Sequence, residues 1–72
     1  MRLTTIKKDG AEIAGIVTAE GVLPTSALNG AKGTSWKTDM MSLIQAGEIP
    51  ALTNWYNQGG KAELEGMAGL VP

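Results

Sequence analysis

The dipeptide Asp9-Gly10 constrains the fold of this chain more than any other short feature of its sequence. It stands between two strand-like segments, and glycine tolerates the positive φ angle that the tight type I′ turn of a hairpin requires. The first segment spans residues 1–8. In the second, residues 11–20, apolar side chains fall on one face and the other face is only partly polar. The sequence therefore predicts an antiparallel hairpin at the start of the chain.

A second turn signal, Glu20-Gly21, leads into a short third strand. Val22 and Leu23 favour extended backbone. Pro24 ends this strand or confines it to a sheet edge, because proline has no backbone N–H to donate. This part of the chain thus predicts a three-stranded meander.

The segment that follows the meander differs in composition from the end of the chain. Residues 25–37 are rich in Ser, Thr, Asn and Gly, and they predict a mobile loop that is tied down at Leu28 and Trp36. Residues 61–72 carry apolar side chains among charged residues and glycines. We expect them to form a final strand beside the meander.

Two short helices are expected between these two segments. In the first, Met40, Leu43 and Ile44 recur at helical spacing, which predicts that they share the buried face. Thr38 is the predicted N-cap of this helix, and Gly47 supplies its C-terminal stop.

The second helix is expected to begin at Pro50 and to end at Gly59, with Leu52 and Trp55 on one face. Neither helix reaches the ~12 to 15 residues at which an isolated helix becomes marginally stable in water, so both are expected to pack on the sheet. The predicted fold class is α+β: a small antiparallel β meander with two short helices packed on it and a final C-terminal strand.

Composition excludes several classes of function. The chain has no cysteine and no histidine, which removes thiol nucleophiles, the commonest metal ligand and the commonest general base. Its net charge of −1 offers no basic stripe, so nucleic acid is not an expected partner. No apolar run reaches the ~20 residues of a membrane span. We expect a cytoplasmic protein that has no membrane partner and no catalytic, cofactor-binding or metal-binding residue in this chain.

Two polar patterns have both a functional and a structural interpretation. Residues 30–35 have the composition of a phosphate-binding loop, but Lys32 precedes Gly33 instead of following it, which favours a plain flexible loop. Glu63 and Glu65 would share one face of a strand, as the start of a divalent metal site or an acid/base pair. Without a third ligand nearby, a solvated strand face is the favoured interpretation.

Aromatic and hydroxyl side chains also have two interpretations. Trp36, Trp55 and Tyr56 could form a stacking platform, but Trp55 and Tyr56 lie on the apolar helix face and are interpreted as core. For Trp36, in the predicted loop, both interpretations stay open. The hydroxyl pairs at residues 25–26 and 34–35 have no histidine or evident lysine base beside them and are interpreted as turn residues.

The segments follow one another in a characteristic order. They are a starting Met-Arg-Leu strand, the Asp9-Gly10 hairpin, the strand 14–17, the turn 20–24, the helix 40–47 and a strand that reaches Leu-Val-Pro at 70–72. This order resembles the N-terminal domain of fumarylacetoacetate hydrolase family proteins. The resemblance covers nearly all of the chain, and the Gly-rich loop 29–37 departs from the family pattern.

The resemblance implies that residues 1–72 form a single N-terminal accessory domain and that a catalytic domain follows residue 72. In this family the following domain holds a carboxylate-bound Mg²⁺ or similar metal and performs hydrolysis, decarboxylation or isomerisation at C–C bonds of oxo-acids. No residue of this chain matches a catalytic residue or metal ligand of the family. The implied partner is the chain's own C-terminal catalytic domain.

A severed accessory domain would also expose apolar surface, and a homodimer is the expected way to cover it. The expected contact is formed by the meander edge that the final strand leaves unpaired, together with the apolar side chains on that strand: Leu64, Met67, Leu70 and Val71. The alternative hypothesis is a free-standing interaction module that binds a protein partner through a sheet edge or through the Trp36 loop.

Overall fold

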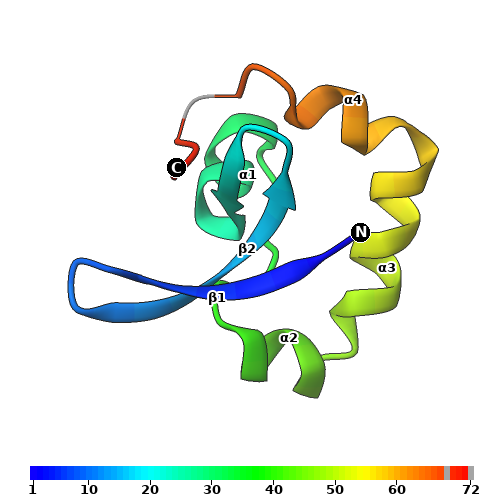
Figure 1. Cartoon of the computed structure of the whole chain (residues 1–72). Helices are drawn as coiled ribbons and strands as arrows, with labels where there is room; N and C mark the ends of the chain where they lie inside the picture. The colour runs from blue at the N-terminus through cyan, green and yellow to red at the C-terminus, as the bar shows by residue number, and fades with distance from the viewer. Residues whose placement is uncertain (68, 72) are drawn as a thin grey trace.

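The computed structural model describes residues 1–67 and 69–71, and it confirms the α+β class and the antiparallel meander (Figure 1). The strands, paired in the order β1-β2-β3, are β1 (Leu3–Lys8), β2 (Ala11–Thr18) and β3 (Gly21–Pro24). The helical segments are α1 (Thr25–Lys32), α2 (Met40–Gln45), α3 (Glu48–Trp55), the π-type turn η1 (Tyr56–Gly60) and α4 (Lys61–Leu64).

The β1–β2 hairpin closes at the predicted turn. Asp9 has φ 53° and Gly10 has φ 80°, so both central residues have the positive φ of a type I′ turn. The flanking residues Lys8 and Ala11 pair with each other, which sets the register of the whole hairpin. Local turn chemistry therefore decides which face of each strand points inward.

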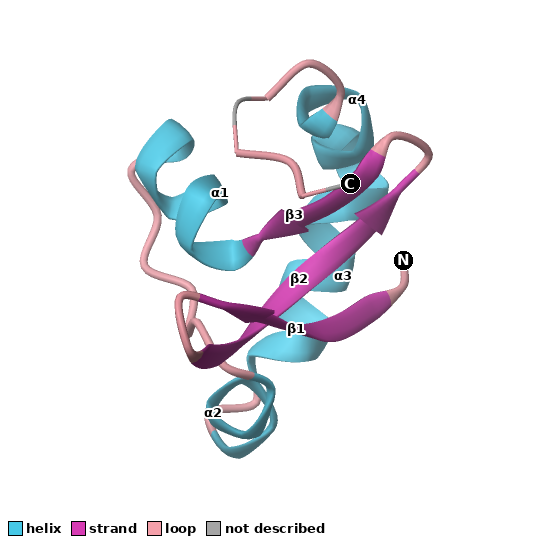
Figure 2. Ribbon diagram, turned by 60° about the vertical axis from the view of Figure 1, so that its left-hand side comes forward, coloured by secondary structure: helices cyan, strands magenta, loops and turns pink. Residues whose placement is uncertain are grey.

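The helices cover one face of the sheet, and α3 lies behind the strands in Figure 2. The buried core joins that face to the helices. Its members are Ile16, Leu23, Leu28, Leu52 and Leu64. On the other face, Val17 and Val22 pair across β2 and β3 and are only half-buried. A Cβ atom at Gly15 would overlap the Val22 side chain. Glycine at this position therefore leaves room for Val22 to pack over β2.

The prediction of a loop over residues 25–37 is wrong for its first part, which forms α1. Leu28 is fully buried and Thr25, the first residue of the helix, is also fully buried. The Thr25 hydroxyl donates to the Lys37 carbonyl oxygen at 2.9 Å. Tertiary packing of one leucine thus stabilises a helix whose Ser, Asn and Gly content disfavours helix formation.

The remaining connection, residues 33–38, is held by the side chain of Asn29. Its amide nitrogen donates to the Trp36 carbonyl oxygen at 2.8 Å, and its oxygen accepts from the Trp36 N–H at 2.9 Å. The same oxygen accepts from the Thr34 hydroxyl at 2.9 Å. Farther along, the Thr38 carbonyl accepts from the Ala14 N–H at 2.9 Å, which fixes the segment beside β2. Hydrogen bonds to α1 and β2 therefore hold this connection in place.

The two predicted helices exist as α2 and α3, with shifted ends. Asp39, not Thr38, is the N-cap of α2, and its carboxylate accepts from the Ser42 N–H at 3.0 Å. Only Leu43 of α2 is buried, so the expectation that Ile44 shares the buried face is wrong. Helix α3 begins at Glu48, ahead of the predicted start at Pro50.

The predicted final strand over residues 61–72 is also wrong within the described residues. Residues 61–64 are helical, and only Val71 pairs with the sheet, through an isolated antiparallel bridge to Val22. Leu64 is 1% exposed, so it is not available as a dimer contact. Pro72 lies outside the described residues.

Candidate functional site

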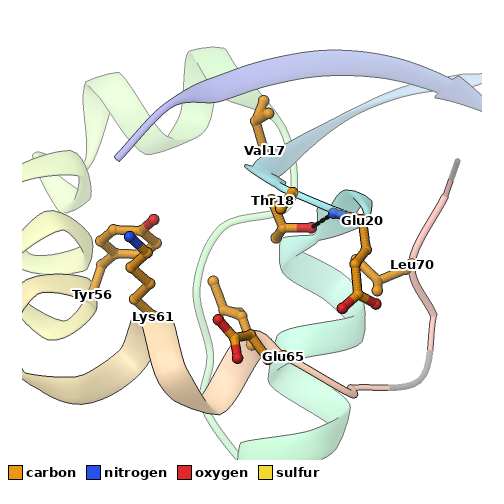
Figure 3. A pocket seen from close by; sticks show the side chains of 9 residues that line it. Val17, Thr18, Glu20, Tyr56, Lys61, Glu65 and Leu70 are labelled. Atoms are coloured by element: carbon orange, nitrogen blue, oxygen red, sulfur yellow. Dashed lines mark hydrogen bonds between the residues drawn. The ribbon is translucent and has the colours of Figure 1, made fainter.

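A pocket of about 260 Å³ lies between the β2–β3 turn and the segment η1–α4 (Figure 3). Its lining residues are Val17, Thr18, Ala19, Glu20, Tyr56, Lys61, Leu64, Glu65 and Leu70. Figure 3 shows Tyr56 and Lys61 on one wall and Glu20 and Leu70 on the other. The pocket therefore mixes apolar surface with side chains of both charge signs.

One polar group of this pocket, the Thr18 hydroxyl, is engaged within the β2–β3 turn. The Thr18 hydroxyl donates to the Gly21 carbonyl oxygen at 2.8 Å and accepts from the Glu20 N–H at 3.2 Å. Both of these hydrogen bonds lie within the β2–β3 turn, so the hydroxyl holds the turn at this wall of the pocket.

The structure separates the two carboxylates that the sequence placed on one strand face. Glu63 lies on α4 and forms an ion pair with Lys32 of α1, whereas Glu65 lines the pocket described above. Within residues 1–67 and 69–71, no three His, Cys, Asp or Glu side chains group closely enough to hold a metal ion.

The glycine-rich segment 30–35 lies at the wrong end of a helix to bind phosphate. Its first half is the last turn of α1, and Gly33 caps that helix at its C-terminus with φ 66°. Phosphate loops instead precede a helix and use the positive end of its dipole. Because Lys32 is also engaged by Glu63, the segment acts as a helix end with an ordered turn.

The aromatic side chains pack against the core and do not form a surface platform. Trp36, Trp55 and Tyr56 are half-buried and contact the core cluster, as predicted for Trp55 and Tyr56. A side chain at Gly60 would meet the Trp55 ring at 2.6 Å, so Trp55 lies directly over this glycine. The buried Nε1 of Trp36 has no hydrogen-bond partner among the described residues.

Helix α2 carries the largest exposed apolar side chains among the described residues, a feature that sequence periodicity missed. Met41 is 60% exposed and Ile44 is 56% exposed. Both line a hollow of about 320 Å³ between α2 and the β1–β2 hairpin. The signal that could have indicated this exposure is the shortness of the helix, because a helix of six residues turns few side chains toward the sheet.

The start of α2 should be sensitive to acid. Hydrogen bonds from the Ser42 side chain and backbone N–H lower the pKa of the Asp39 carboxyl below its ordinary value. A lowered folded-state pKa means that the cap stabilises the fold above the unfolded-state pKa, and that this contribution disappears as the pH falls through the folded-state pKa. We expect the Ser42 amide signal to lose its cap shift at a pH below the range in which an aspartate of an unfolded chain titrates. An NMR titration with Asp39→Asn as control measures this loss, and a Ser42 shift that changes in the same pH range as a free aspartate would contradict it.

Comparison with protein-family models, curated proteins and solved structures finds no match for this chain. No helix of the described residues is both long and apolar enough to cross a membrane.

Proposed function

We propose that this chain is the non-catalytic N-terminal domain of a fumarylacetoacetate hydrolase-like enzyme. The parent would be a cytoplasmic, metal-dependent hydrolase, decarboxylase or isomerase that acts on C–C bonds of oxo-acids. Mg²⁺ or a similar ion would be bound by the catalytic domain that follows residue 72. In this proposal the chain's own partner is that domain.

The observation that carries this proposal is the exposed apolar surface of α2. The helix forms part of the segment order on which the resemblance rests, and its Met41 and Ile44 are more than half exposed, at 60% and 56%. Contiguous exposed apolar surface is a common feature of sites that another protein surface covers. An accessory domain that docks on a catalytic domain needs such a surface, and contacts between domains bury roughly 600–1,500 Å².

The proposal also includes a homodimer of the isolated domain, with a contact that differs from the predicted one. Leu64 is buried and Met67 and Leu70 pack against the core, so among the described residues these three do not form an exposed apolar strand. Without a catalytic domain to cover it, the exposed α2 surface with Met41 and Ile44 would form the twofold contact instead. We expect sedimentation equilibrium of the isolated domain to detect a dimer at high concentration, and a strictly monomeric species at millimolar concentration would contradict this.

The coding sequence tests the accessory-domain proposal directly. We expect the reading frame to continue past codon 72 into a segment of β-rich pattern that contains clustered Asp, Glu and His residues. Sequencing of the transcript decides between this outcome and a stop codon. A stop codon would contradict the proposal and favour the free-standing interaction module.

A further inference from the structure

Strand β1 is an edge strand with backbone hydrogen-bonding groups that face away from the sheet. The Val17 N–H donates to the Arg2 carbonyl at 2.9 Å, so Arg2 and Val17 form a hydrogen-bonded pair. Hydrogen-bonded and non-hydrogen-bonded pairs alternate along an antiparallel ladder. The next pair, Leu3 and Ile16, is therefore not hydrogen-bonded, and the backbone groups of Leu3 point outward. By the same alternation, Thr5 and Lys7 also point their N–H and C=O groups outward. The Ala14 N–H confirms the pattern, because it points away from β1 and donates to Thr38.

This edge is accessible and lies between positive charges. Thr5, at its centre, is exposed. Arg2 precedes the strand and Lys7 and Lys8 end it, and all three side chains are exposed. They are half of the six basic residues of the chain. Among the described residues the only ion pair joins Lys32 to Glu63, so none of these three cations forms an ion pair. The nearest carboxylates along the hairpin are Glu12, opposite Lys7, and Asp9, which follows Lys8, and neither lies on the outer side of β1.

The charges disfavour pairing between two copies of β1. An antiparallel pairing centred on Thr5 would place Arg2 of one copy opposite Lys8 of the other, and the same pair would recur at the far end. Like charges opposite each other across strands are destabilising. Lysine at a sheet edge is a common protection against such self-pairing. A partner strand with carboxylates at these positions would gain attraction instead.

We propose that the β1 edge binds an extended peptide segment that is acidic at both ends and apolar or β-branched in the middle. In antiparallel register, acidic residues of the partner lie opposite Lys8 and Lys7 at its N-terminal end and opposite Arg2 at its C-terminal end. The outward groups of Leu3, Thr5 and Lys7 give the main-chain hydrogen bonds, and the charges give the direction and the register. This inference is independent of the enzyme resemblance.

The probe is a synthetic peptide, Glu-Glu-Val-Ile-Thr-Val-Glu with blocked ends, and its matched control has lysine at every glutamate. Titration of each peptide into the ¹⁵N-labelled chain is followed by NMR. We expect the acidic peptide to shift the amide signals of Leu3, Thr5 and Lys7, and to bind at least about tenfold more tightly than the basic peptide. Added salt should reduce this difference, because exposed charges are screened.

Two variants separate the backbone contribution from the charge contribution. Thr5→Pro removes an outward N–H without removing a hydrogen bond to β2, and it should abolish binding. The double variant Lys7→Glu and Lys8→Glu should weaken acidic-peptide binding about tenfold and improve binding of the basic peptide. Its control, Lys37→Glu with Lys61→Glu, makes the same change in net charge at exposed positions away from β1 and should retain binding. If Thr5→Pro does not fold, the charge variants still test whether the acidic peptide binds at the β1 edge.

Several results would overturn the proposal. They are equal binding of the acidic and basic peptides, shifts confined to other parts of the chain, and no binding at millimolar peptide. An absence of binding at millimolar peptide would mean that the lysines serve only to prevent self-pairing of β1. Concentration-dependent dimerisation that shifts the β1 amides without any peptide would assign the edge to a second copy.

Discussion

Replacing Leu28 by alanine is expected to lower the free energy of unfolding by about 2–5 kcal/mol, the usual cost of a buried Leu→Ala change. Leu28 is fully buried in the core cluster and is the one buried apolar residue of α1. A domain of this size has a total stability of only about 4–11 kcal/mol. The variant should therefore melt more than about 10 °C below the unchanged chain in a thermal scan followed by circular dichroism.

The matched control for Leu28→Ala is Ile44→Ala. Ile44 is 56% exposed, and truncation of an exposed side chain usually changes stability by less than about 0.5 kcal/mol. If Leu28→Ala melts within a few degrees of the unchanged chain, α1 does not depend on its packing against the sheet. The same outcome would contradict the placement of Leu28 in the core.

Asn29→Ala is expected to cost about 2 kcal/mol, because it removes three hydrogen bonds at once and leaves Trp36 backbone groups unpaired. The effect should be concentrated in the connection 33–38. Hydrogen exchange of the Trp36 amide should accelerate in this variant more than exchange of the β2 amides. Denaturant unfolding measures the global cost and NMR hydrogen exchange measures the local one.

Two further variants sharpen the Asn29 test. Asn29→Asp keeps an acceptor for Trp36 N–H and for Thr34 but loses the donor to the Trp36 carbonyl, so its cost should be intermediate. Asn57→Ala changes an exposed asparagine and should be nearly neutral. Equal stability of Asn29→Ala and Asn57→Ala would show that the connection is held by something other than the Asn29 side chain.

The meander was predictable from sequence because its signals are local. Alternating apolar residues and the Asp9-Gly10 turn define β1 and β2 and their register without any distant contact. Pro24 similarly ends β3 at its own position. Helix ends were less predictable from sequence, because Thr38 and Asp39 are both favourable N-cap residues and only the observed bond to Ser42 distinguishes them.

Helix α1 was not predictable in the same way, because its residues taken alone favour turns. Its stability depends on Leu28 reaching a core built from distant parts of the chain and on Asn29 meeting Trp36 seven positions later. The predicted final strand failed for a related reason. Leu64 completes the core from a helix, and the chain then turns at Gly66, with φ 81°, and at Gly69, with φ 100°. One residue, Val71, is left to pair with the sheet.

The features of the candidate surfaces also depend on tertiary structure. The pairing of Glu63 with Lys32 separates it from Glu65, and sequence spacing alone gave no sign of this. Exposure of Met41 and Ile44 follows from the position of α2 beside the hairpin and not from its periodicity. The β1 edge is different, because its outward-facing groups follow from the hairpin register that the turn already implies.

The proposed accessory domain would dock on its catalytic domain through the α2 surface. Oxidative footprinting of Met41 tests this docking most directly, by comparing the isolated chain with the polypeptide encoded by the full reading frame. Met67, which packs against the core, is the internal reference. We expect Met41 to oxidise at least about tenfold more slowly in the longer polypeptide, while Met67 changes little, because docking would remove the exposed thioether from solvent. Equal Met41 oxidation in both forms, or a reading frame that stops at codon 72, would contradict the proposal.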